Sequence, residues 1–163
     1  MAAGRLWNRE RWRNAAVFYS LVSLWPDIDA IGFRFGVRYE DPLGHRGGTH
    51  SLALALAVAL GAYAYARWAE LPPARTAILA GIVAASHGIF DTMTFGGGLG
   101  CALLWPFSTH RFWAPFRFIP VAPIGAGMIS SRGLYVVAVE SLLFAPFFLY
   151  ALIPRRRAAS PPS

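Results

Sequence analysis

Four apolar segments alternate with polar stretches along the 163-residue chain: residues 15–25, 51–66, 76–90 and 133–154. They are longer than typical strands, and Ala and Leu dominate the two central segments. Charged residues and histidines interrupt them rarely, at His87 in the third segment and at Glu140 in the fourth. The pattern therefore predicts four helices, of which the first ends before Pro26 and the fourth contains Pro146.

The predicted helices are suited to a membrane. A helix that crosses a bilayer needs about 20 residues, with a range of about 17–25, and none of the segments is an ideal uncharged span of that length. A soluble helical bundle with a very apolar core is the alternative, but soluble helices show a polar face, and residues 51–66 have none. We therefore expect an all-α fold, a multi-pass membrane bundle of about four apolar helices.

The composition agrees with this class of protein. Hydrophobic residues make up 56% of the chain and charged residues 14%, against about 25% charged in soluble proteins, which excludes a disordered chain. The single cysteine, Cys101, excludes a disulfide framework and a cysteine-based zinc cage. We expect one membrane-embedded domain, residues 1–154, followed by a disordered Arg/Pro tail, residues 155–163.

All fifteen basic residues are arginine, against eight acidic residues, which gives a net charge of +7. Nine of them lie before the first segment, between the second and third, and after the fourth: Arg5, Arg9, Arg11 and Arg13, then Arg67 and Arg75, then Arg155, Arg156 and Arg157. The other six lie in the two stretches on the opposite side, so the bias is nine to six. The positive-inside rule places these groups in the cytoplasm, and we expect a protein of the plasma (inner) membrane without a cleavable signal. Because apolar segments separate the groups, we expect membrane lipids and no nucleic acid as partners.

Two stretches between the third and fourth segments cannot continue a helix. Residues 96–100 are rich in glycine, and residues 105–127 contain repeated prolines among aromatic and arginine side chains. The second stretch is typical of the headgroup level of a membrane, or of a proline-rich lid over a protein core.

Most of the aspartates and histidines lie in three short motifs at the ends of apolar segments: Asp27 with Asp29, His45 with His50, and His87 with Asp91. With the arginine groups in the cytoplasm, all three motifs fall on the non-cytoplasmic side of the membrane. His87 and Asp91 are four residues apart, so they share one helix face and can point at one ion.

The second motif needs a flexible backbone, because a single helix would splay two histidines that are five residues apart. Gly47 and Gly48 supply that freedom, and Thr49 is the expected N-cap of a helix that begins at His50. His45 would then come from the loop and His50 from the first helical turn.

Asp27 and Asp29 are two residues apart and would diverge on a regular strand or helix. Three interpretations remain open: the chain turns there, one carboxylate binds a metal while the other supports a ligand, or each serves a different ion of a pair.

Histidine and carboxylate without thiolate suit Zn²⁺, with Mn²⁺ or Fe²⁺ as alternatives. We therefore expect a divalent metal ion held by members of one set: Asp27, Asp29, His45, His50, His87 and Asp91. The competing interpretation is structural, with Asp27, Thr49 and Asp91 capping helices and the histidines packed as polar core. Ionisable groups next to apolar helices are costly and tend to be functional, which favours the metal site.

Three further polar residues have open roles. Arg46 is suited to a bidentate contact with a phosphate or carboxylate, or to an ion pair with Asp27 or Asp29. His110 fits a proton donor, an extra ligand or an ordinary surface histidine. Glu140 either faces the site or pairs with an arginine.

These motifs resemble the YdjM-like membrane-bound metal-dependent hydrolases of bacteria and archaea. The resemblance extends from about residue 15 to residue 135 and is carried by WPDID (25–29), GHRGGTHS (44–51), SHGIFD (86–91), LLWPFS (103–108), RFIPVAPIG (117–125) and SSRG (130–133). It implies a multi-pass fold in which Asp27, Asp29, His45, His50, His87 and Asp91 are metal ligands. Family members usually begin with an earlier apolar helix that bears a histidine, whereas this chain has no histidine before His45.

The first functional hypothesis is a hydrolase in which a divalent ion activates water. Asp29 or Asp27 would act as general base and Arg46 would stabilise an anionic transition state, on a lipidic or phosphoester small-molecule substrate. A metal-binding transporter or sensor without hydrolysis is the alternative, and a purely structural membrane module ranks below both. The sequence does not predict an oligomeric state.

Overall fold

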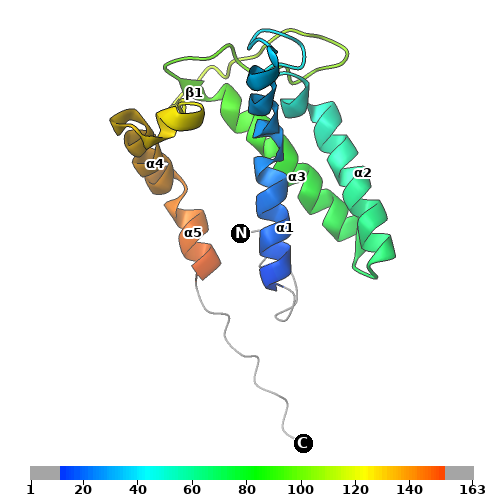
Figure 1. The fold of residues 1–163 in the computed structure, drawn as a ribbon. Helices are drawn as coiled ribbons and strands as arrows, with labels where there is room; N and C mark the ends of the chain where they lie inside the picture. The colour runs from blue at the N-terminus through cyan, green and yellow to red at the C-terminus, as the bar shows by residue number, and fades with distance from the viewer. Residues whose placement is uncertain (1–11, 153–163) are drawn as a thin grey trace, which may run out of the picture.

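The computed structural model describes residues 12–152, and three helices run side by side in it (Figure 1). Helix α1 is Trp12–Leu24, α2 is Leu52–Trp68 and α3 is Pro73–Thr92. They correspond to the first three apolar segments, so the three predicted helices are confirmed. Arg5, Arg9, Arg11 and the expected tail, residues 155–163, lie outside the described residues.

Small side chains allow α2 and α3 to pack closely as an antiparallel pair. Ala55, Ala62, Ala80 and Ala84 are buried between the helices, and a Cβ placed on Gly81 would stand 3.1 Å from the Cβ of Ala59. Close approach through small residues is the usual way in which helices pack in membranes, where the hydrophobic effect does not drive them together.

Helix α1 completes this core with two larger side chains. Tyr19, 1% exposed, packs against Ala62 and Ala80, and Val22 packs against Ala55 and Ala84. Helix α1 thereby packs against the α2–α3 pair, and its C-terminal end lies near the N-terminal end of α2.

The fourth apolar segment forms two helices, so the prediction of one helix over residues 133–154 is wrong. Helix α4 is Ser131–Leu143 and α5 is Ala145–Leu152, with the break at Phe144. Pro146 explains the break, because proline has no N–H to donate and its ring collides with the carbonyl four residues earlier. Within α5 it lies in the first turn, where proline is tolerated.

The remaining described chain forms short elements and loops at one end of the helices (Figure 1). The 3₁₀ helices are η2 (Trp25–Phe35), η3 (Gly48–His50) and η4 (Gly125–Ile129). Strand β1 (Thr94–Phe95) pairs in parallel with β2 (Ile119–Pro120). The expectation that residues 105–127 contain no long helix is confirmed, but this small sheet was not predicted, since two-residue strands show no alternating pattern.

Among the described helices, α3 is the one long and apolar enough to cross a membrane, and α2 is apolar but shorter, with 17 residues. Only 22% of the apolar window of α3 is buried, which differs from the core helix of a soluble protein. Large apolar side chains such as Leu56, Leu60 and Ile82 are more than half exposed. The fold is mostly helical, with apolar outer faces.

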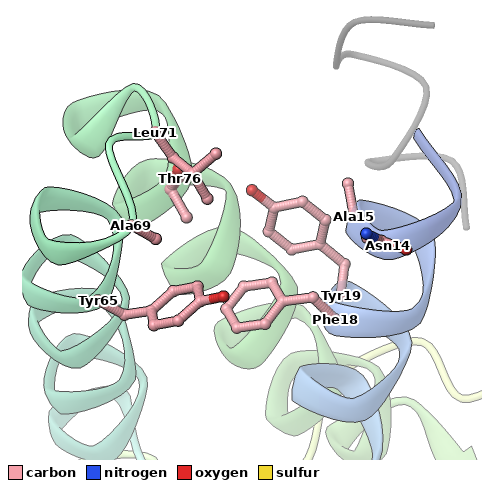
Figure 2. Close-up of a pocket in the computed structure, with 8 residues that line it drawn as sticks. All are labelled: Asn14, Ala15, Phe18, Tyr19, Tyr65, Ala69, Leu71 and Thr76. Carbon is pink, nitrogen blue, oxygen red and sulfur yellow. The ribbon is translucent and has the colours of Figure 1, made fainter. Parts of the chain in front are cut away.

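A cavity of about 330 Å³ lies between α1 and the α2–α3 turn (Figure 2). The rings of Phe18 and Tyr65 stack across it at 6.1 Å, and Tyr19 reaches toward Leu71 and Thr76. This cavity is at the opposite end of the helices from the aspartates and histidines, and it contains none of the candidate site residues.

Candidate metal centre

Three segments that are distant in sequence bring the candidate residues together. The 3₁₀ helix η2 carries Asp27 and Asp29, the loop and η3 carry His45 and His50, and the last turns of α3 carry His87 and Asp91. Gly88 allows this approach, because a Cβ at that position would overlap the carbonyl oxygen of His50.

Four of these side chains direct one atom each to a common point. The Nε2 of His50 lies 3.5 Å from Oδ1 of Asp27 and 3.2 Å from Oδ2 of Asp91. The Nε2 of His87 lies 3.4 Å and 3.8 Å from the same two oxygens. All four atoms fall within 4.8 Å of one another.

These distances fit a divalent ion. Ligands held at about 2.0–2.1 Å in a tetrahedron are about 3.3–3.4 Å apart, close to the separations of 3.2–3.8 Å. Two imidazoles and two carboxylates also balance the charge of a divalent cation. We refer to Asp27, His50, His87 and Asp91 as the four-residue cluster.

The imidazole nitrogens that face this point lie close to carboxylate oxygens but make no hydrogen bonds with them. The Nε2 atoms of His50 and His87 are buried, and neither has a hydrogen-bond partner within residues 12–152. A buried polar atom without a partner is costly. The neighbouring carboxylates lie close to these nitrogens without hydrogen-bond geometry, which is how ligands of one ion are arranged.

Asp29 and His45 lie behind the four-residue cluster. Oδ1 of Asp29 is 2.7 Å from Nδ1 of His45, and Oδ2 is 3.2 Å from Nδ1 of His50. Oδ2 also accepts hydrogen bonds from the backbone N–H of Arg46 and the hydroxyl of Thr49. Asp29 is thus engaged on both oxygens, and it orients His50 so that Nε2 faces the cluster.

A second grouping, Asp29, His45 and His50, also has three ligand atoms within 4.8 Å of one another. It shares His50 with the four-residue cluster, and its Asp29 atoms are already engaged with imidazole, hydroxyl and backbone donors. Of the three interpretations of Asp27 and Asp29, the contacts favour one carboxylate in the cluster and the other supporting a ligand. The 3₁₀ helix η2 points the two side chains to opposite nitrogens of His50.

The charges of the cluster stabilise one another. Burial opposes ionisation of Asp27, but the imidazoles of His50 and His87 outweigh it and hold its pKa well below the usual range. Burial likewise opposes the charge of Asp29, while His45, His50 and Thr49 hold its pKa low. Burial disfavours the His50 cation, but Asp27, Asp29 and Asp91 raise its pKa to about 10. A metal ion must therefore displace a proton from His50.

Arg46 is placed differently from the prediction. It pairs with Asp91, at 3.2 Å from Nε to Oδ2, instead of with the side chain of Asp27 or Asp29. Its Nη1 donates to Thr94 Oγ1 at 2.7 Å and to the carbonyl of Asp91 at 3.3 Å, and the residue is 4% exposed. These contacts favour a role in holding Asp91 in position.

Arg111 is a residue that the sequence interpretation missed. Its guanidinium donates to four backbone carbonyls, those of Tyr39, Asp41, His45 and Gly100. It therefore ties the loop that carries His45 to the glycine-rich stretch. The four acceptors are backbone atoms from distant segments, so no residue pattern around Arg111 signals this role.

The capping interpretation of the polar motifs is not supported. Ser51, rather than Thr49, is the N-cap of α2 and accepts a hydrogen bond from the N–H of Leu54, so the predicted cap is wrong. Thr49 instead donates to Asp29. Helix η2 has no side-chain cap, and the carboxylate of Asp91 faces Arg46 and the imidazoles.

His110 is an exposed residue whose ring contacts Phe112, with 4.7 Å between the ring centroids. It belongs to neither group of ligand atoms, and the surface interpretation is the one its position favours.

Fold and site together define a helical protein with apolar outer faces and a partly buried His/Asp centre whose ligand atoms are suited to a divalent ion. The model of the YdjM inner membrane protein family matches residues 1–158. The chain is 34% identical over 125 residues to the inner membrane protein YbcI of Escherichia coli (strain K12), which covers 76% of this chain and 72% of the relative. No solved structure matches it.

The chain therefore belongs to the YdjM inner membrane protein family, and the expected family is confirmed. Membership supports a location in the inner membrane. Both descriptions state a location and neither states a reaction.

Proposed function

We propose that the protein is a membrane-bound, metal-dependent hydrolase with one divalent ion, Zn²⁺ by preference, held by the four-residue cluster. The observation that supports this most strongly is the pair of buried Nε2 atoms of His50 and His87. They make no hydrogen bond within residues 12–152, and they face two carboxylate oxygens at separations typical of tetrahedral ligands. Mn²⁺ and Fe²⁺ share this preference for imidazole and carboxylate.

Asp29 and Arg46 hold the ligands of that ion in position. When bound, the ion lowers the pKa of water toward neutrality and polarises the bond to be cleaved. Asp29 holds His50 in the tautomer that presents Nε2, and Arg46 holds Asp91. Because both oxygens of Asp29 are engaged, Asp29 is less suited to act as general base than the sequence suggested.

Access to the site is through Asp27. Its side chain is 48% exposed, whereas that of His50 is fully buried. A substrate therefore approaches the cluster from the side of η2. We propose a lipidic or phosphoester substrate, because the site lies at the end of apolar helices, where a lipid headgroup and a small soluble ester are both within reach.

We further propose that α1, α2, α3 and the α4–α5 segment all cross the membrane, with the site on the non-cytoplasmic side. The exposed apolar faces of these helices support several crossings. Arg67 and Arg75 flank the α2–α3 turn at the end opposite to the site, which the positive-inside rule assigns to the cytoplasm.

The test is a hydrolysis assay on detergent-purified protein loaded with Zn²⁺, using a panel of phosphoesters and carboxylic esters that includes phospholipids. We expect turnover that chelation abolishes and Zn²⁺ restores. The His50→Ala, His87→Ala double variant should lose both turnover and metal, while the matched control His110→Ala should keep both. Metal binding with no turnover on the whole panel would contradict hydrolysis and favour a metal transporter or sensor.

A further inference from the structure

Glu140 lies on the face of α4 that packs against the rest of the protein. Gly133 and Val136 on the same face are buried, with Val136 completely inaccessible, and Glu140 itself is partly buried. Leu134 and Leu142, on other faces of the helix, are at least 70% exposed. The one carboxylate of this apolar helix therefore points away from the lipid-facing surface.

Two observations place Glu140 beside the four-residue cluster. The ring of Phe144, the residue that directly follows α4, contacts the ring of Phe90 at 5.5 Å between centroids, and Phe90 directly precedes Asp91. The carboxylate of Glu140 also interacts electrostatically with those of Asp91 and Asp27. Glu140 thus lies near the cluster, on the side of α3 that packs against Phe144.

The surroundings of Glu140 do not explain its presence. Among residues 12–152 its carboxylate has no hydrogen-bond or ion-pair partner, and its electrostatic neighbours are like charges. It lies outside both groups of ligand atoms, so it is not a fifth ligand. Because Asp27 and Asp91 already balance a divalent ion, a third carboxylate nearby is available to accept and release a proton.

We propose that Glu140 is the proton-transfer residue of the hydrolytic reaction, a role that rests on the proposed function. As the oxygen of the attacking water bonds to the phosphorus or acyl carbon, one O–H bond breaks and the proton passes to the Glu140 carboxylate. The bond from that centre to the leaving oxygen then breaks, and Glu140 returns the proton to the leaving oxygen. Each turnover thus restores the ionised carboxylate.

The experiment compares Glu140→Gln with the parent and with Glu70→Gln, a matched control that removes the same charge in the α2–α3 turn. Bound metal is measured by elemental analysis, and turnover on the ester panel is measured with Zn²⁺. We expect Glu140→Gln to keep the parent's metal content and to lose about 10²–10⁴-fold in turnover. Glu70→Gln should match the parent in both measurements.

A second measurement does not depend on activity. The visible spectrum of the Co²⁺-loaded protein is titrated with pH, because it reports protonation next to the ion. The parent should show a step that is absent from Glu140→Gln and present in Glu70→Gln. Identical titrations of all three proteins would overturn the proposal, as would loss of metal from Glu140→Gln or turnover within about threefold of the parent.

The two measurements separate the two proposals. A parent that binds metal but hydrolyses nothing refutes the proposed function, and the Co²⁺ titration then still decides whether Glu140 exchanges a proton beside the ion. A parent that hydrolyses the panel, with Glu140→Gln equally active, refutes only the role of Glu140.

Discussion

Replacing Asp29 by asparagine tests whether Asp29 orients a metal ligand instead of binding an ion itself. Asp29 is 8% exposed, and its two oxygens contact His45, His50, Thr49 and the backbone N–H of Arg46. Asparagine has the same shape but replaces one oxygen with a donor NH₂ group. That group then faces another donor, and the negative charge that orients the two imidazoles is lost.

The size of the effect follows from these contacts. A buried donor left without an acceptor costs about 1–3 kcal/mol, and part of this cost falls on the orientation of His50 that metal binding requires. At about 1.4 kcal/mol per tenfold change, this corresponds to roughly 5- to 150-fold in metal affinity. Loss of a residue that supports a ligand typically costs about 10–100-fold, so we expect Asp29→Asn to weaken Zn²⁺ binding within that range.

The assay is a competition titration of Zn²⁺ against a chelator in detergent, with Asp41→Asn as the control. Asp41 is a carboxylate of the exposed loop that pairs with Arg38, so its variant should bind as the parent does. The number of ions per chain should remain one in Asp29→Asn. A fall from two ions to one would refute the reasoning, because it would make Asp29 and His45 ligands of a second ion.

The remaining predictions concern neighbours of the cluster. Gly88→Ala should reduce metal content, measured by elemental analysis, because the added Cβ overlaps the carbonyl oxygen of His50; Gly61→Ala, with open space around it, should not. Arg46→Lys should weaken Zn²⁺ affinity by about tenfold in the same competition titration, because lysine cannot contact Asp91 and Thr94 together. The affinity for Zn²⁺ should also fall as the pH falls below about 10, the raised pKa of His50, because the ion must displace a proton from this imidazole. Calorimetry in buffers of different ionisation enthalpy should therefore count about one proton released per ion at neutral pH. Unchanged metal content in Gly88→Ala, parent-like affinity in Arg46→Lys, or binding without proton release would each contradict its prediction.

The helices could be predicted because their signal is local. Residues 51–66 and 76–90 are rich in Ala and Leu and contain no proline, and the bounds of α2 and α3 differ from those of the segments by only a few residues. The fourth segment shows the limit of this reasoning. Its apolar character continues through Pro146, but the backbone hydrogen bonds do not, so hydrophobicity alone overestimates the length of the helix.

The sequence predicted in part which residues form the site. The i, i+4 spacing of His87 and Asp91 places both on one helix face, and both contribute an atom to the four-residue cluster. The division between Asp27 and Asp29 could not be predicted, since it depends on the turn of η2 and on which nitrogen of His50 each carboxylate meets.

The partners of Arg46 illustrate the same limit. The sequence interpretation offered Asp27 or Asp29 as an ion-pair partner, but the backbone at Arg46 adopts a positive φ of 63°, and the side chain reaches Asp91 on α3. A single residue in the left-handed region redirects a side chain, and no sequence pattern marked that conformation at an arginine.

X-ray absorption spectroscopy of the Zn²⁺-loaded protein tests the central claim most directly, because it measures the ligands of the ion. The four-residue cluster predicts one ion per chain, with two imidazole nitrogens and carboxylate oxygens at about 2.0–2.2 Å and no sulfur. A shell of oxygen atoms with no imidazole scattering, or a spectrum unchanged in the His50→Ala, His87→Ala variant, would contradict it.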